Sequence, residues 1–316
     1  MKKWYYRYVV FYERNERMTN KKVAVITIVC ICIIALVSFI IWKNLTKNEQ
    51  ETDGNIKIVS SFYPIYIMTE NITEGAEDIE LVNMADVNVG CLHDYTLTTE
   101  DMKKVEDADV FVQNGLGMES FIDKIISSNN NLTLIDSSEG IENIIQHEDK
   151  TNAHIWTNID NYIKQVENIS NGLQQADAAN AEIYKNNTNE YIQKLQGLKE
   201  RYTSELASLE GTKVINLNEA FEYLGQELKM DMTTIVTDHE ESTMSAEMLG
   251  NIISQVEQEN IEMIIVDKND NKSNAETIAN ETGAKIYELN SGLTGDLDRD
   301  AFVRAMEENL NVLLER

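Results

Sequence analysis

The chain has 316 residues, which is long enough for two domains of ordinary size, each with its own hydrophobic core. Its 54 acidic and 27 basic residues give a formal net charge of −27 at pH 7. A surface that acidic repels nucleic acid and anionic lipid headgroups, whereas it attracts cations. The three cysteines, at positions 30, 32 and 91, form no recognisable disulfide framework.

Residues 23–41 form an uninterrupted apolar run flanked by lysines. A run of that length predicts one transmembrane helix, and the basic residues before it predict that the N-terminus stays in the cytoplasm. We therefore expect a cytoplasmic N-terminus at 1–22, an anchor at 23–42, a polar stalk at 43–55, and an extracellular body held at the cell membrane. The run shows no small-residue cleavage box, so we expect it to stay attached, although Met18 is an alternative start.

The remainder of the chain alternates between short apolar runs and amphipathic segments, a pattern typical of strands and helices that build a parallel sheet. The predicted strands are 56–60, 79–84, 110–113 and 132–135, then 213–217, 233–237, 263–266 and 285–289. Between the two sets, apolar residues keep helical spacing from 160 to 209. We expect an α/β fold of two lobes, 56–175 and 210–316, each with a four-stranded parallel sheet, joined by a long rigid helix at 176–209.

A histidine stands between the second predicted strand and the helix that follows it. His93 precedes a Thr-Thr-Glu-Asp sequence at 98–101, whose hydroxyls and carboxylates predict a helix start. Open α/β sheets bind ligands at the carboxyl ends of their strands, so His93 is a candidate ligand; the alternative is a loop histidine that only hydrogen-bonds its neighbours. His154 and His239 also fall in predicted loops, whereas we expect His147 in a solvated loop. Imidazoles and carboxylates gathered from several loops favour zinc, and more oxygen ligands favour manganese.

Several motifs follow one another along the predicted body. They are Phe-Tyr-Pro-x-Tyr at 62–66, His-Asp-Tyr at 93–95, Asn-Gly-x-Gly-x-Glu at 114–119, His-x-Trp at 154–156 and Asn-Ala-x-x-Tyr-x-x-Asn at 180–187. In these motifs the chain resembles the substrate-binding proteins of zinc and manganese ABC importers, a family that includes adhesin-type lipoproteins. The resemblance covers nearly everything after the anchor. It implies two α/β lobes that hold Zn²⁺ or Mn²⁺ between them as a transported ligand and deliver it to an ABC permease.

The resemblance also implies four metal ligands. The family's two histidines fall on His93 and His154. Its third ligand, a histidine or glutamate before an Ala-Phe-x-Tyr segment, falls on Asn218, and its aspartate after the last strand falls on Asn290. An asparagine offers one uncharged carbonyl oxygen, which is a poorer ligand for zinc or manganese than imidazole or carboxylate. The two amides therefore put tight metal binding in question.

Other residues at neighbouring strand ends could replace the two strong ligands that the asparagines do not supply. A site that adds His239 and one carboxylate to the two matched histidines restores a zinc-type ligand set. The available carboxylates are Glu219, Asp238 and Asp267. Cys91 offers a thiolate, although a cysteine that binds nothing is the simpler interpretation.

Three functions follow from these observations. The first is a monomeric extracytoplasmic receptor that binds Zn²⁺ or Mn²⁺ and hands it to an ABC permease in the membrane. The second is a relative that keeps the fold, binds metal weakly or not at all, and acts as a surface adhesin or interaction protein. An enzyme is the weakest option, because the chain has no His-Glu-x-x-His, Gly-x-Ser-x-Gly or P-loop sequence. We expect the metal receptor; the sequence does not choose between zinc and manganese as its ligand.

Overall fold

The computed structural model describes residues 55–93, 95–129, 131–147, 150–235 and 244–316, together with Val25, Ile31 and Ile33. Met1–Gly54 and Asn55–Arg316 form two separate units, and the second is the body described below. No helix in the described ranges is both long and apolar enough to cross a membrane. The predicted N-terminus, anchor and stalk, at 1–22, 23–42 and 43–55, lie outside the described residues apart from those three residues and Asn55.

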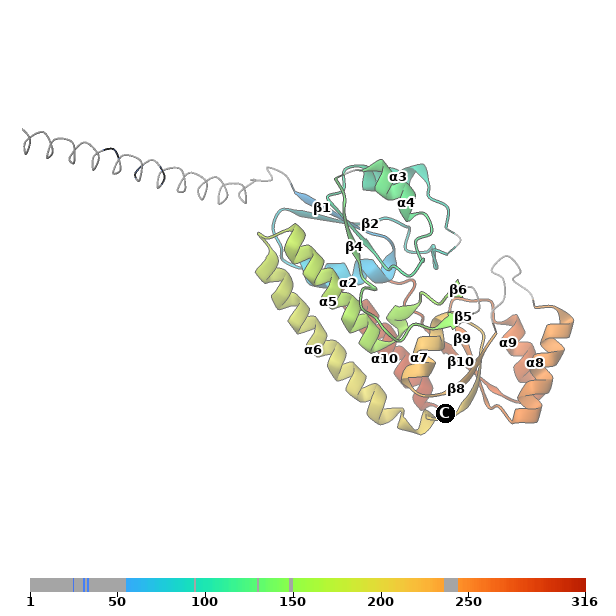
Figure 1. Cartoon of the computed structure of the whole chain (residues 1–316). Helices are drawn as coiled ribbons and strands as arrows, with labels where there is room; N and C mark the ends of the chain where they lie inside the picture. The colour runs from blue at the N-terminus through green and yellow to red at the C-terminus, as the bar shows by residue number, and fades with distance from the viewer. Residues whose placement is uncertain are drawn as a thin grey trace, which may run out of the picture. The chain divides into compact units, whose positions relative to one another are not determined.

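The first half of the body contains a parallel four-stranded sheet. Its strands are β1 (Ile56–Ser60), β2 (Ile79–Asn83), β3 (Val110–Gln113) and β4 (Thr133–Asp136), in the order β2-β1-β3-β4. The helices that alternate with them are α2 (Tyr63–Thr73), α3 (Thr99–Glu106) and α4 (Ile122–Ser128), as Figure 1 shows. Strand β3 is buried along its whole length, which is expected of a parallel strand covered on both faces. The predicted first sheet is confirmed.

The second half repeats this arrangement. Its strands are β7 (Lys213–Asn216), β8 (Asp231–Thr234), β9 (Met263–Asp267) and β10 (Lys285–Leu289), all parallel, in the order β10-β9-β7-β8. Its helices are α7 (Glu222–Glu227), α8 (Ala246–Glu259), α9 (Ser273–Thr282) and α10 (Ala301–Leu314). In each sheet the first strand along the chain lies between the second and the third, so the strand order reverses beside it. Binding sites of open α/β sheets form at that reversal, outside the carboxyl ends of the strands.

A helical pair connects the two halves, where the sequence predicted one long helical stretch over 160–209. Helix α5 (Ile159–Ala176) ends before residue 177, and α6 (Ala181–Glu205) starts at residue 181. The buried Asp177 holds the intervening turn, because its Oδ2 accepts hydrogen bonds from Asn180 Nδ2 at 2.7 Å and from the Tyr184 hydroxyl at 2.6 Å. The chain turns back there, and α5 and α6 pack side by side (Figure 1).

Helix α6 contacts both halves of the body. The Asn187 side chain donates to the carbonyl of Ile72 on α2 at 2.9 Å, and the Tyr202 hydroxyl donates to the carbonyl of Met306 on α10 at 2.6 Å. These contacts support the linker role predicted for residues 176–209, which stays a prediction. Before this pair lie a two-strand hairpin, β5 (Gln146–His147) and β6 (Lys150–Thr151), and a short 3₁₀ turn, η1 (Ile155–Thr157).

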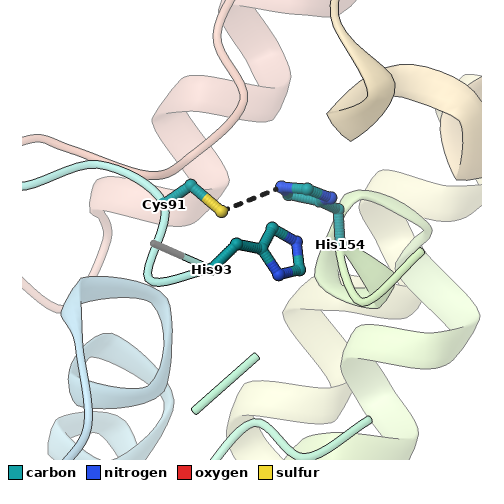
Figure 2. A group of neighbouring side chains, drawn as sticks. All are labelled: Cys91, His93 and His154. Carbon is teal, nitrogen blue, oxygen red and sulfur yellow. Dashed lines mark hydrogen bonds between the residues drawn. The ribbon is translucent and has the colours of Figure 1, made fainter. Parts of the chain in front are cut away.

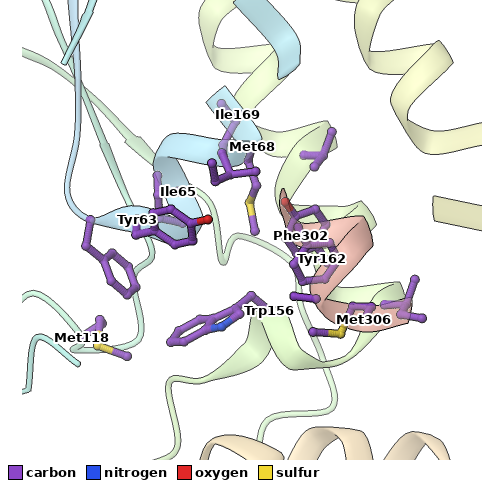
Figure 3. Packing of buried hydrophobic residues seen from close by; sticks show 14 of the residues in the cluster. Tyr63, Ile65, Met68, Met118, Trp156, Tyr162, Ile169, Phe302 and Met306 are labelled. Atoms are coloured by element: carbon purple, nitrogen blue, oxygen red, sulfur yellow. The ribbon is translucent and has the colours of Figure 1, made fainter. Parts of the chain in front are cut away.

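Buried aromatic side chains join the two halves in one hydrophobic core. Tyr162 of α5 stacks on Phe302 of α10 with ring centroids 3.6 Å apart (Figure 3). Trp156 packs edge to face against Phe62, with ring centroids 5.4 Å apart. The indole Nε1 of Trp156 donates to the carbonyl of Ser291 at 2.9 Å, across the two halves. Packing between aromatic faces is directional, so this cluster fixes how the two sheets stand relative to each other.

Candidate metal site

The loop between β2 and α3 carries Cys91 and His93, and the start of α3 holds its far end. Thr98 Oγ1 accepts from the Asp101 backbone N–H at 3.2 Å, and Asp101 Oδ2 accepts from the Thr98 backbone N–H at 2.8 Å. This reciprocal capping box confirms the helix start predicted from the sequence. The fully buried Leu92 lies between the two candidate ligands and anchors the loop in the core, while their own side chains stay half-buried.

Asn152 orients His154 through hydrogen bonds to its backbone and its ring. The Asn152 Oδ1 lies 2.9 Å from both the backbone nitrogen and the ring Nδ1 of His154. Asn152 Nδ2 donates in turn to Glu222 Oε2 at 2.7 Å and to the Glu219 carbonyl at 2.9 Å, which fixes its amide orientation. Since Oδ1 is an acceptor, Nδ1 of His154 carries its proton and Nε2 keeps a lone pair. A metal-binding histidine is commonly oriented in this way.

Cys91, His93 and His154 meet in space. Their donor atoms all lie within 4.8 Å of one another, and the Cys91 Sγ is 3.5 Å from His154 Nε2 (Figure 2). The two imidazole rings stand edge to face with centroids 5.2 Å apart. Glu219, at the start of the 3₁₀ turn η3 (Glu219–Phe221), places Oε1 3.9 Å from His93 Nε2 and 3.9 Å from His154 Nδ1. One sulfur, two imidazoles and one carboxylate are thus gathered from three loops.

The cluster adjoins an acidic cavity of about 310 Å³. The polar and charged residues that line it are Cys91, His154, Asn218, Glu219, Asp267, Asn269, Asp270, Ser291 and Thr294. Asn218 and Glu219 follow β7, and Asp267 ends β9, so these residues lie where the strand order of the second sheet reverses. A cavity with three carboxylates beside two imidazoles attracts a cation.

Of the two asparagines predicted at the family's ligand positions, one lines this cavity and the other lines a neighbouring one. The Asn218 Oδ1 accepts from the Ala220 backbone N–H at 2.9 Å, and its Nδ2 donates to Asp270 Oδ2 at 2.7 Å. Asn290 lines a separate cavity of about 220 Å³, and its Oδ1 accepts from the Gly292 backbone N–H at 3.0 Å. The structure therefore brings Asn218, but not Asn290, to the cavity that His154 lines. Their roles as ligands stay predictions.

The remaining predicted residues are distributed as follows. His239 and Asp238 lie outside the described residues, so their part in the site stays a prediction. The buried Asp267 accepts backbone N–H groups on both carboxylate oxygens, from Asn269 at 2.7 Å and from Ser291 at 3.2 Å. These bonds brace two loops at the cavity wall.

The structure also places His147 and two residues that the sequence analysis does not name as candidates. His147, expected in a solvated loop, is 39% exposed and lies with Nε2 2.6 Å from Glu222 Oε2. Asp270 and Asn152 were not singled out from the sequence. An asparagine two residues before a candidate histidine ligand is a usable signal, because its side chain can bond to the backbone N–H two positions on.

The turn after β3 contacts the cluster through Met118. Glu119 accepts from the backbone N–H groups of Asn114 at 2.7 Å and Gly115 at 3.1 Å, and from the Ser61 hydroxyl at 2.7 Å. Complete burial raises the pKa of this carboxyl to about 7. The glutamate of the Asn-Gly-x-Gly-x-Glu motif therefore holds the turn in place by hydrogen bonds. The same turn positions the buried Met118, whose Sδ lies 3.7 Å from the Cys91 Sγ.

The chain matches the family described as zinc-uptake complex component A, periplasmic (ZnuA), over residues 58–316. The zinc-binding lipoprotein AdcA of Streptococcus pneumoniae is 25% identical over 287 residues, which cover 84% of this chain and 57% of AdcA. The manganese-binding lipoprotein MntA of Halalkalibacterium halodurans is 27% identical over 295 residues, which cover 90% of this chain and 95% of MntA. The chain therefore spans little more than half the length of AdcA but nearly the whole of MntA.

Solved structures share the fold. The SBP FpvC of Pseudomonas aeruginosa in complex with Mn²⁺ has a TM-score of 0.73 and 25% sequence identity, with 83% of this chain and 97% of FpvC covered. The family match includes both sheets apart from the first two residues of β1, the helical pair and all four residues of the cluster. The chain therefore belongs to the zinc-uptake complex component A (ZnuA) family.

Proposed function

We propose that this protein is an extracytoplasmic receptor that binds Zn²⁺ or Mn²⁺ in the acidic cavity and delivers it to an ABC permease. The observation that carries the proposal is the meeting of His93 and His154 beside Glu219. The two histidines come from loops far apart in the sequence, and the fold brings their rings to 5.2 Å. Two imidazoles and a carboxylate are a ligand set suited to a divalent cation of this class.

The family match supports delivery to a permease. The names of the two relatives given above support zinc and manganese alike as the metal. One is named for zinc and the other for manganese. Both are named as lipoproteins, which supports a place outside the cytoplasm. For this chain we propose that the apolar segment 23–42 is a single-pass anchor, that the body works as a monomer, and that His239 is a further candidate ligand.

A second function is favoured by one observation at the site. Asn218 lines the cavity, but it is uncharged, its oxygen already accepts from Ala220 N–H, and its amide nitrogen donates to Asp270, so it supplies neither the imidazole nor the carboxylate of a strong ligand. A receptor with a weakened site fits a surface adhesin or interaction protein that keeps the fold.

A metal titration of the full-length chain, stripped with a chelator, separates the two functions. The receptor proposal predicts that one Zn²⁺ or Mn²⁺ binds per chain and that the His93→Ala/His154→Ala double variant loses this binding. His147→Ala is the matched control, since His147 contacts Glu222 and not the cluster, and it is expected to keep affinity within a few-fold. Full affinity in the double variant refutes the proposed site, and no binding by the native chain favours the second function.

A further inference from the structure

We propose that Cys91 is a metal ligand and that its thiolate makes the site select zinc over manganese. This inference rests on the proposed receptor function and adds the identity of the metal to it. It concerns a residue outside the ligand set that the family resemblance implies for this chain.

The distance between the sulfur and the nearest imidazole nitrogen is the first support. Zinc binds sulfur at about 2.3 Å and imidazole nitrogen at about 2.0–2.1 Å, so two such ligands at a tetrahedral angle stand roughly 3.5 Å apart. The Cys91 Sγ and His154 Nε2 are separated by 3.5 Å (Figure 2). The two atoms therefore already stand at the spacing that one zinc ion imposes on them.

The ligand count is the second support. His93 brings the third donor atom within 4.8 Å of the other two, and Glu219 Oε1 lies 3.9 Å from His93 Nε2. Together they make a set of one sulfur, two nitrogens and one carboxylate oxygen, which matches the number of ligands that zinc takes in tetrahedral sites. The proposal requires the Glu219 side chain, which is 19% exposed, to turn its oxygen toward the metal on binding.

The chemistry of sulfur sets the preference. Thiolates suit zinc and softer ions, whereas carboxylate, carbonyl and water oxygens suit manganese. The buried Met118 Sδ, 3.7 Å from Cys91 Sγ, gives the thiol a polarisable apolar neighbour. Binding breaks the S–H bond of Cys91, the sulfur coordinates Zn²⁺, and the proton leaves to solvent.

The test uses the full-length chain with Cys30→Ser and Cys32→Ser, so that Cys91 is the remaining thiol. The Cys30→Ser/Cys32→Ser chain, with Cys91 unchanged, is the control for the Cys91 variants. Addition of Co²⁺ is expected to produce the near-ultraviolet thiolate-to-cobalt charge-transfer band, and Cys91→Ser is expected to remove it. Zinc affinity should fall at least about tenfold in Cys91→Ser, while manganese affinity changes less. Cys91→Asp should move the preference toward manganese, and circular dichroism checks that each variant folds.

Proton release gives an independent readout. Calorimetry of zinc binding in buffers of different ionisation enthalpy should show one proton more for the background chain than for Cys91→Ser. Tight zinc binding without the charge-transfer band, and with equal affinity in Cys91→Ser, overturns the role of Cys91 and leaves the receptor proposal intact. Failure of every chain to bind Zn²⁺, Co²⁺ or Mn²⁺ overturns both.

Discussion

The Oδ1 of Asn152 lies 2.9 Å from the backbone nitrogen of His154 and 2.9 Å from its ring Nδ1, so one amide oxygen sets both the backbone and the tautomer of a candidate ligand. The amide nitrogen of the same side chain donates to Glu222 Oε2, which lies 2.6 Å from His147 Nε2. A chain of contacts therefore runs from the cluster to a part-exposed histidine. Its first link sets the tautomer of His154, with the proton on Nδ1 and the lone pair of the neutral ring on Nε2.

Asn152→Ala should lower zinc affinity by roughly 10- to 100-fold without removing a ligand, because His154 loses the partner that orients its ring. The measurement is a competition titration with a zinc-binding dye. Asn158→Ala is the matched control: Asn158 caps α5 by accepting from Asn161 N–H, so its loss costs about 1 kcal/mol of stability away from the cluster. Unchanged zinc affinity in Asn152→Ala contradicts the orienting role.

Glu219→Gln should weaken both zinc and manganese binding by at least about tenfold, because the cluster loses a negative charge that lies 3.9 Å from each of its two imidazoles. Asn290→Ala is the informative comparison, since Asn290 lines the neighbouring cavity and is expected to leave both affinities within a few-fold. An equal loss in Asn290→Ala indicates that the cavity rearranges on binding and brings Asn290 to the metal.

Trp156→Phe should destabilise the body by about 1–3 kcal/mol, because the buried carbonyl of Ser291 loses its indole donor and the smaller ring leaves a gap. Urea unfolding followed by circular dichroism measures the change. Tyr66→Phe is the control, because the hydroxyl of the part-buried Tyr66 makes a long, 3.4 Å hydrogen bond to Glu70, and its removal is expected to cost little. Equal stability of Trp156→Phe and the native chain argues against a role of this bond in joining the two halves.

Glu227 predicts a pH dependence of stability. Burial raises the pKa of its carboxyl to about 7; Oε2 accepts from Ile159 N–H at 3.0 Å, while Oε1 has no hydrogen-bond partner within the described part of the chain. Between the ordinary value of 4.5 and about 7, the folded chain holds a proton that the unfolded chain has released. The free energy of unfolding therefore falls as pH rises through this window, by up to roughly 3 kcal/mol above it.

Glu227→Gln keeps an oxygen for the Ile159 N–H and removes the ionisation, so its stability should decline less than that of the native chain as the pH rises above 7. Urea unfolding at a series of pH values gives the comparison. The exposed Glu182→Gln serves as the control for removing one negative charge. Parallel pH profiles for the native chain and Glu227→Gln rule out Glu227 as the source of the dependence.

The sequence predicted the two parallel sheets because buried strands and amphipathic helices leave local periodic patterns, as at Val110–Gln113 and the capped start of α3. The break between α5 and α6 was missed, because Asp177, Asn180 and Tyr184 form a turn that depends on side-chain contacts rather than on glycine or proline. The two-residue strands of the β5-β6 hairpin are too short to leave a periodic signal.

At the site, the motifs identified His93 and His154, but not what surrounds them. Cys91 adjoins His154 only through the fold, since the two lie 63 positions apart in the chain, and this contact supports the proposal that Cys91 is a ligand. Asn290 lines a different cavity, and its Oδ1 accepts from the Gly292 N–H; an asparagine can predict such a local turn, but not which cavity the loop faces.

The most direct test of this account is a metal competition. The full-length chain, stripped with a chelator, is dialysed against equal concentrations of Zn²⁺ and Mn²⁺ under reducing conditions, and its metal content is measured by mass spectrometry. A receptor whose site includes the Cys91 thiolate should hold one zinc ion per chain and almost no manganese. A chain that emerges without metal, or with manganese in excess of zinc, contradicts the account.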